Sequence, residues 1–381
     1  MISLKFLLVL SNAFWLCKAE DELVAVTTLM RHGARIPNNF YPTDPYSKVK
    51  WPFVLGDLTN EGIAEMHDVG KWLRRKYSDF LSKKYDPKEM YAQALDYDRC
   101  IRSGEACLAG LYPPTSAENW NPQLRWRPTP IHISPAHQDI VVNMNACPKI
   151  PKESALIRKT ETYRQIMAVY GDTFKYIGEK SGHPIDFASM YPLFDTLLFE
   201  RRLNLTLPDW AQKVWPHLTP LAIQYSKMDS MTTTERRIQS GPMLGRIQNQ
   251  FDRAITGVDF GTTKTIYRKY MVYFATEWML LNLTYTLGLP SIGIPDFGAL
   301  YIFELWKNEM GTHYVKIYFR HSGLKGTKAK RVAVEGEKAK LKYEKFKQII
   351  APYLVDSVEW VALCESFTHK NVTVDTDVPM S

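Results

Sequence analysis

Cysteine is scarce in this chain, with five residues in a length of 381, and no group of them has the spacing of a zinc site. Cys100 and Cys107 lie about two turns apart on one predicted helix, which is too far for their sulfur atoms to bond. We therefore expect both to be buried free thiols. Neither a metal nor an organic cofactor is expected.

Long hydrophobic runs are also missing. At the amino end, Lys5 precedes the short apolar run 6–10, and a cleavage site before Glu20 predicts a secretory signal peptide over residues 1–19. This run is too short and interrupted to span a membrane. Residues 368–381 contain no apolar tail, which argues against a membrane anchor. We expect a protein of the secretory route, secreted or lysosomal, with no membrane span.

The chain has no internal repeat, no low-complexity linker and no nucleic-acid-binding motif. Much of its formal net charge of +8 comes from two basic segments, residues 325–331 and 338–347. Around the second segment, apolar residues approximate one face of a helix whose other face would carry the lysines: Leu341, Phe346, Ile349, Ile350 and Tyr353. We expect no nucleic-acid partner, although a basic surface can attract anionic phosphoesters or acidic glycans.

Apolar residues are plentiful enough for a large core. Hydrophobic residues make up 45% of the chain and aromatic residues 13%, which suits one large domain with a smaller lobe. Strands alternate with helices such as residues 59–77, which predicts an α/β fold with a central, mostly parallel sheet covered on both faces. The helix-rich residues 152–256 are expected to form a cap on a core of residues 20–151 and 257–381.

The most informative segment is residues 31–37, which read R-H-G-A-R-I-P and follow an apolar, β-branched run. The run predicts a buried strand, so His32 would lie at a strand's carboxyl end, where α/β sheets bind ligands. Arg31 and Arg35 could hold a phosphate group while His32 attacks phosphorus and passes the phosphoryl group to water. Taken alone, R-H-x-x-R also occurs in surface loops.

Further motifs extend this pattern along most of the mature chain. Residues 96–99 read D-Y-D-R, residues 126–132 read W-R-P-T-P-I-H, and residues 193–210 end in L-P-D-W. Together with residues 31–37, they resemble the histidine acid phosphatase family, in the branch of the prostatic and lysosomal acid phosphatases. The resemblance implies a phosphoglycerate mutase-like core and a helical cap that roofs the catalytic pocket and helps to choose the substrate.

The resemblance also implies roles for single residues. Arg99 would be the third phosphate-binding arginine, although by sequence alone it could equally be a solvated helix residue. Cys147 and Cys364 would form a long-range disulfide. The family's cap-to-core disulfide would fall at Phe199 and Phe297, where two phenylalanines are compatible with an apolar contact instead.

One departure from the family lies after the strand expected over residues 269–274, where a histidine-aspartate pair is usual. Here Thr276 replaces the histidine and keeps a hydroxyl donor, but it cannot carry positive charge. Glu277 replaces the aspartate, which protonates the leaving alkoxide, and keeps a carboxylic acid on a longer arm. The related multiple inositol polyphosphate phosphatases use a glutamate in H-A-E, but Ala275 stands at that histidine position. Glu277 could also be a first-turn helix residue favoured by the helix dipole.

We therefore expect an acid phosphatase that hydrolyses phosphate monoesters through a phosphohistidine on His32, with Glu277 as acid and an acidic pH optimum. The alternative is a catalytically weak or inactive relative that binds phosphorylated ligands. A phosphoglycerate mutase-like transferase shares R-H-G, but the signal peptide and L-P-x-W argue against it. The sequence leaves a homodimer open. Three N-x-T triplets are glycosylation candidates: Asn204, Asn371 and, within a predicted helix, Asn282.

Overall fold

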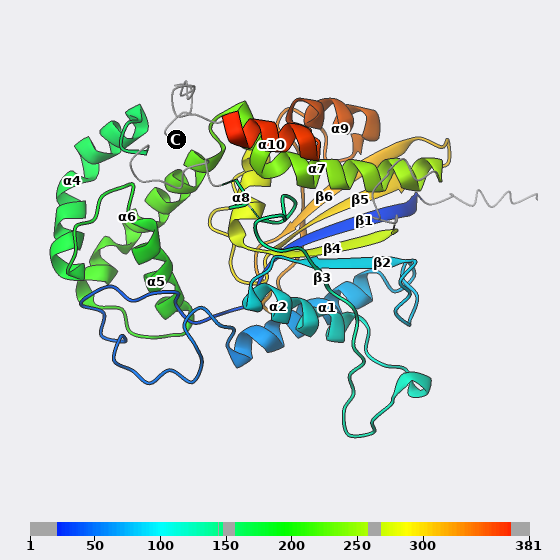
Figure 1. Cartoon of the computed structure of the whole chain (residues 1–381), viewed down its shortest axis with the longest axis horizontal. Coiled ribbons are helices and arrows are strands. Elements are labelled where there is room, and N and C mark those ends of the chain that lie inside the picture. Colours follow the sequence, from blue (N-terminus) through cyan, green and yellow to red (C-terminus); the bar gives the residue numbers. More distant parts are fainter. Residues whose placement is uncertain (1–20, 144, 148–156, 258–267, 367–381) are drawn as a thin grey trace, which may run out of the picture.

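The computed structural model describes residues 21–143, 145–147, 157–257 and 268–366 (Figure 1). The predicted signal peptide and the glycosylation candidate Asn371 lie outside the described residues. None of the described helices combines the length and apolarity needed to cross a membrane.

A mixed eight-stranded sheet forms the centre of the protein, with strand order β3-β2-β4-β1-β5-β6-β7 and β8 paired with β6. The sheet is parallel from β3 to β1 and antiparallel from β1 onward, so the expected parallel arrangement holds for one side only. The strands are β1 (Glu22–Arg31), β2 (Met90–Ala94), β3 (His132–Ile133), β4 (Tyr270–Ala275), β5 (Leu300–Lys307), β6 (His313–Arg320), β7 (Lys330–Val332) and β8 (Leu341–Lys342).

Helices cover both faces of this sheet (Figure 1). One face packs against α1 (Asn60–Lys76) and α2 (Asp98–Leu111), and the other packs against α7 (Thr233–Thr256), α8 (Glu277–Thr286) and α9 (Tyr343–Ile350). Both faces of β1 and β4 are thereby buried, which explains why these strands are rich in apolar and β-branched residues. Thr59 caps α1 by accepting a hydrogen bond from the Gly62 amide at 3.1 Å.

The cap has an apolar core of its own. It is built from α4 (Glu161–Ser181), α5 (Tyr191–Arg202) and α6 (Asp209–Lys227), which bury side chains such as Phe174, Phe187 and Phe194 against one another. The α7 helix falls inside the range expected for the cap, but its buried side chains pack with the sheet.

Two shorter segments differ from the expected helix around the second basic segment. Leu341 lies in β8, where it pairs with Val315, and Tyr353 lies in the 3₁₀ helix η3 (Ala351–Tyr353), so only the middle of that segment is α-helical. The sheet ladder takes precedence because Leu341 buries its side chain while pairing its backbone. Further short helices are η1 (Ser116–Glu118), η2 (Met228–Ser230) and the α-helix α10 (Ser357–Ser366).

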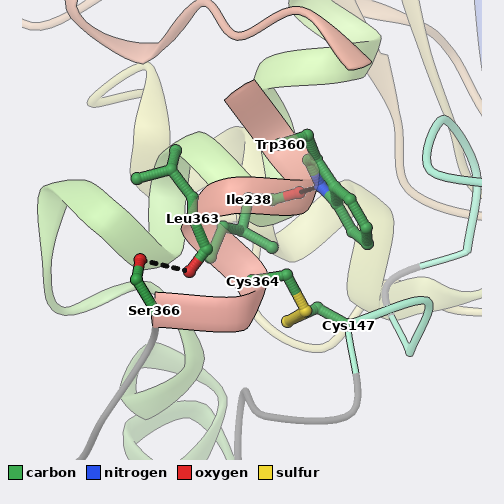
Figure 2. Close-up of a disulfide and its surroundings, with 6 residues drawn as sticks. All are labelled: Cys147, Ile238, Trp360, Leu363, Cys364 and Ser366. Atoms are coloured by element: carbon green, nitrogen blue, oxygen red, sulfur yellow. Dashed lines mark hydrogen bonds between the residues drawn. A yellow bond between two sulfur atoms is a disulfide. The ribbon is translucent and has the colours of Figure 1, made fainter. Parts of the chain in front are cut away.

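A disulfide joins Cys147, after β3, to Cys364 in α10, with an S–S distance of 2.01 Å, as the family resemblance implies (Figure 2). Trp360 packs beside it and donates from Nε1 to the Ile238 carbonyl at 2.9 Å (Figure 2). Cys100 and Cys107 are buried free thiols, as expected. The bridge fixes the carboxyl-terminal helix to the first half of the core.

We expect the double variant Cys147→Ser/Cys364→Ser to lose about 2 to 5 kcal/mol of unfolding free energy, because the cross-link restricts the unfolded chain. Urea denaturation would measure the loss, with Cys107→Ser as a thiol control. Reductant should destabilise the wild type but not the double variant. Equal stability of the double variant and the wild type would contradict the structural role of the bridge.

Candidate active site

His32 follows β1 directly, at the junction between the parallel and the antiparallel halves of the sheet. Its backbone amide donates to the Ala275 carbonyl at 3.0 Å, and its carbonyl accepts from the Gly298 amide at 3.0 Å. The buried imidazole places Nδ1 2.9 Å from the Gly33 carbonyl oxygen. Because a carbonyl only accepts, this contact favours the proton on Nδ1 and leaves the Nε2 lone pair available for attack.

Gly33 allows this segment to pass close to α1. A Cβ atom at this position would lie 2.5 Å from the Gly62 carbonyl oxygen, closer than real side chains come. Gly33 therefore allows the segment that carries His32 to pack against the start of α1.

Arg31 is held from three sides beneath the site. Its Nε lies 3.0 Å from a Glu277 carboxylate oxygen, and one of its terminal nitrogens donates to the Pro295 carbonyl at 2.6 Å. The guanidinium carbon also lies 4.3 Å from the centre of the Phe297 ring, a cation–π contact. These contacts fix the orientation of the guanidinium, which is almost fully buried.

The other two predicted arginines come from separate elements. Arg35 donates to the Asp195 carboxylate of α5 at 2.7 Å and to its neighbour Ile36. Arg99 lies in the first turn of α2, with its guanidinium carbon 4.6 Å from the Tyr97 ring and a buried Nε without a protein partner. Arg102, in the same helix, forms an ion pair with Asp57.

A cavity of about 270 Å³ brings the predicted residues together between the core and helix α5 of the cap. His32, Arg35, Arg99, Thr276 and Glu277 all line it, while Arg31 reaches it through the ion pair with Glu277. The wall is completed by residues of the cap and the core loops, among them Asn38, Asn39, Tyr97, Asn143, Asn145, Tyr191, Asp195 and Trp278. The cavity thus joins a buried imidazole, guanidinium groups and a carboxyl group.

The electrostatics of the cavity keep His32 uncharged. Burial, followed by the positive charges of Arg99, Arg31 and Arg35, lowers the pKa of His32 well below its ordinary value. The imidazole is therefore neutral into the acidic range. A neutral ring is the nucleophilic form.

Glu277 experiences opposing influences. Burial favours its neutral form, but the charges of Arg31 and then Arg35 outweigh burial and lower its pKa below the ordinary value. In the unliganded site the group is thus a carboxylate paired with Arg31. A dianionic ligand would neutralise the arginines and so raise the pKa of Glu277.

Two features of the site were not assigned from the sequence. Asp195 lies within residues 193–210, a segment that resembles the family, but the sequence suggests no role for this residue. In the structure it forms an ion pair with Arg35. Phe297 lies beside both Arg31 and His32, with its ring centre 5.7 Å from that of the imidazole. The expected apolar contact is confirmed, because Phe297 also packs edge-to-face on Phe199 of α5 at 5.8 Å.

The structure separates the glycosylation candidates. Asn204 is exposed in the turn after α5. Asn282 is fully buried in α8, where it hydrogen-bonds with Gln239 and Ser230, so the prediction of a glycan there is wrong. The N-x-T pattern identifies a possible acceptor asparagine, but it does not show whether that side chain is buried in the fold.

A buried acidic pair lies where the cap meets the loop after the histidine motif. Burial and then the neighbouring carboxylate of Asp44 raise the pKa of Glu200 in α5. Burial also raises the pKa of Asp44. The folded pair therefore holds a proton that the unfolded chain releases, and this costs stability increasingly as pH rises above the ordinary carboxyl pKa.

We expect Glu200→Gln to raise the melting temperature more at about pH 8 than at about pH 5, because it removes this proton-linked cost. Thermal unfolding at both pH values would test this, with Glu179→Gln, an exposed change on α4, as control. A shift independent of pH would count against a shared proton.

Known proteins share this arrangement of sequence and fold. A family model described as "Histidine phosphatase superfamily (branch 2)" matches residues 22–320. The chain belongs to this superfamily. Its members include phosphatases similar to this chain at moderate identity. The lysosomal acid phosphatase of Xenopus laevis is 30% identical over 353 residues, covering 91% of this chain and 79% of that protein. The prostatic acid phosphatase of Homo sapiens is 29% identical over 330 residues, covering 84% and 83% respectively.

Solved structures show the same fold. The phytase of Citrobacter braakii superposes with a TM-score of 0.68 at 18% identity, covering 90% of this chain and 99% of the phytase. A Hafnia alvei phytase gives a TM-score of 0.67 at 16% identity, with coverage of 90% and 98%. At these identities, the likeness concerns the fold alone. Across the described residues, no three His, Cys, Asp or Glu side chains cluster as metal ligands.

Proposed function

We propose that this protein hydrolyses phosphate monoesters through a phosphohistidine formed on His32. The observation that carries the proposal is a neutral, buried imidazole whose Nε2 is free, in one cavity with arginines and a carboxyl group. Its membership in a family of phosphomonoester hydrolases supports the same reaction.

In the first step, the guanidinium groups hold the phosphate and His32 Nε2 attacks phosphorus, while the bond from phosphorus to the ester oxygen breaks. Glu277 gives its proton to the departing alkoxide. Phosphate binding itself prepares this acid, because the dianion neutralises the arginines that otherwise keep Glu277 ionised.

In the second step, water attacks the phosphohistidine. The carboxylate of Glu277 takes a proton from the water as the new phosphorus–oxygen bond forms, and the histidine–phosphorus bond breaks. Inorganic phosphate leaves, and Glu277 then releases to solvent the proton that corresponds to the one it took up on substrate binding, so His32 and Glu277 return to their initial states. In this proposal, Thr276, which begins α8 beside Glu277, donates its hydroxyl to a phosphate oxygen.

The decisive experiment is rapid quenching of the reaction with a ³²P-labelled phosphate monoester at acidic pH in the presence of a chelator. The proposal predicts a labelled protein whose bond survives base but not acid, as expected for phosphohistidine. It also predicts that the label is absent from His32→Ala. Steady hydrolysis without a labelled intermediate would overturn the covalent route.

A second candidate is a binder of phosphorylated ligands with little or no turnover. It is favoured by Thr276, which cannot carry charge, and by Glu277, which is engaged with Arg31 in the unliganded site. Tight binding of vanadate or phosphate without any release of product would select this candidate. Turnover that depends on His32 would exclude it.

The lining of the cavity suggests its substrates. Arg35 and Arg99 are the only cationic side chains among the described residues lining it, and the remaining wall includes Asn38, Tyr191 and Trp278. Trp278 packs on Tyr191 with ring centres 4.7 Å apart. We propose that the site takes esters with a single phosphate on a small or aromatic group.

We therefore expect kcat/KM for p-nitrophenyl phosphate to exceed that for inositol hexakisphosphate by at least about tenfold, since further phosphates would meet no additional cation. Parallel assays of phosphate release would measure the ratio. Comparable values for the two substrates would show that the cavity accommodates polyphosphorylated rings.

We also propose that the protein belongs to the secretory route, as a secreted or lysosomal enzyme. The Cys147–Cys364 disulfide supports this, because such bonds persist mainly in oxidising compartments. The lysosomal and prostatic relatives agree with it.

A further inference from the structure

A second hollow in the surface lies along the antiparallel side of the sheet. It has a volume of about 610 Å³ and shares no residue with the catalytic cavity. We call it the basic groove and define it by Trp72, Arg75, Lys76, Tyr318, Lys325 and Lys328. It is formed by the outer side of α1 and the loop between β6 and β7.

Cationic and aromatic side chains are paired along this side of the sheet. The Lys76 ammonium lies 4.8 Å from the Tyr318 ring centre, and the Lys316 ammonium lies 3.7 Å from that of Trp306 on the neighbouring strand. Tyr318 and Lys316 are two residues apart on β6, so both face the same side. These contacts hold the ammonium groups in place before any ligand arrives, which lowers the entropy lost on binding.

Glu304 anchors this arrangement from below. Its carboxylate is almost fully buried, accepts a hydrogen bond from Trp306 Nε1 at 2.8 Å and lies 2.9 Å from the Lys76 ammonium. Tyr77 donates to the same carboxylate at 2.8 Å. The buried carboxylate of Glu304 therefore positions Lys76, Tyr77 and Trp306 and does not neutralise the cations at the rim of the groove.

The rim retains its positive charge. Arg75, Lys325 and Lys328 are exposed, and none of them forms an ion pair within the described parts of the chain. Several unneutralised cations along one hollow create a local positive potential that attracts a polyanion.

We propose that the basic groove binds a sulfated glycan chain. Single-stranded nucleic acid needs open aromatic faces on which bases stack, whereas the Tyr318 ring here already faces an ammonium group. A glycan that carries its anionic groups along its length needs only the charges. The disulfide supports an oxidising environment, where such glycans are the common polyanions.

Surface plasmon resonance on immobilised heparin tests the proposal with the full chain. We expect Arg75→Ala/Lys325→Ala/Lys328→Ala to bind at least about tenfold more weakly than wild type, and wild-type binding to weaken as salt rises. The matched control is Lys159→Ala/Lys175→Ala/Lys213→Ala, which removes the same charge from exposed cap positions. An equal loss of heparin affinity in both triple variants would show that binding depends only on the net charge of the protein, and it would overturn the proposed binding site in the groove.

The class of partner is tested with the same variants. Desulfated heparin should bind less than heparin, and DNA oligonucleotides of similar charge should bind less than heparin. DNA that binds as well as heparin would overturn the glycan assignment. Hydrolysis of p-nitrophenyl phosphate and the melting temperature should be unchanged in the groove variant, so failure of this proposal is distinct from failure of the proposed function.

Discussion

Replacing His32 with alanine is expected to lower kcat for p-nitrophenyl phosphate by on the order of 10⁴- to 10⁶-fold, because the nucleophile itself is removed. The three arginines remain, so phosphate or vanadate should still bind. Single-turnover release of nitrophenolate at acidic pH would measure the loss. Binding retained with chemistry lost is the result that separates a nucleophile from a structural histidine.

The matched control for this experiment is His67→Ala, an exposed histidine on α1. It should leave both turnover and melting temperature unchanged. If His32→Ala retained even one tenth of the wild-type rate, an imidazole nucleophile would be excluded. Loss of vanadate binding together with unfolding would instead show that the imidazole is needed for the fold, which a thermal melt of the variant detects directly.

Replacing Glu277 with glutamine is expected to slow hydrolysis of an alkyl phosphate by on the order of 10²- to 10⁴-fold, the usual contribution of a general acid. The loss with p-nitrophenyl phosphate should be smaller for formation of the phosphoenzyme, because nitrophenolate departs without protonation. Burst kinetics would compare this step for the two substrates. Equal losses would mean that Glu277 acts only by holding Arg31.

The pH profile carries the same information. His32 has a lowered pKa, so acidification leaves the nucleophile neutral until well below the ordinary histidine range. Glu277 must be protonated when substrate is bound, so wild-type turnover of an alkyl phosphate should fall as pH rises through the pKa of the complex. The glutamine variant should lack this alkaline decline. Glu277→Asp should retain it and recover part of the rate.

Much of the core and the site could be predicted from local sequence. The apolar, β-branched run before His32 is typical of a strand buried on both faces, and the register of β1 with β4 then places Glu277 next to Arg31. The motif residues meet because the parallel strands end at one edge of the sheet. The aromatic pair Phe199 and Phe297 followed from the resemblance, and the structure confirms their contact.

Other features depend on distant packing that a linear pattern does not contain. The antiparallel half of the sheet arises because β5 returns as a neighbour of β1, and nothing local to Leu300–Lys307 specifies the strand beside it. The amphipathic pattern of α7 would suit a helix of the cap or a helix of the core. Only the tertiary structure shows that its side chains pack on the sheet. Asn282 carries an acceptor triplet on a helix buried on every side, which sequence periodicity could not exclude.

The α5 helix is joined to the candidate active site at two points: Asp195 binds Arg35, and Phe199 packs on the Phe297 ring, which lies beside Arg31. In the proposed reaction, a phosphate bound to the Arg35 guanidinium would compete with Asp195 and so weaken the first of these contacts. The contact between Phe199 and Phe297 is apolar and contains no directional bond, so the two rings could shift relative to each other without breaking one. In the proposed reaction, the contact between Asp195 and Arg35 would therefore open when substrate binds and form again when phosphate leaves, which would couple α5 to product release.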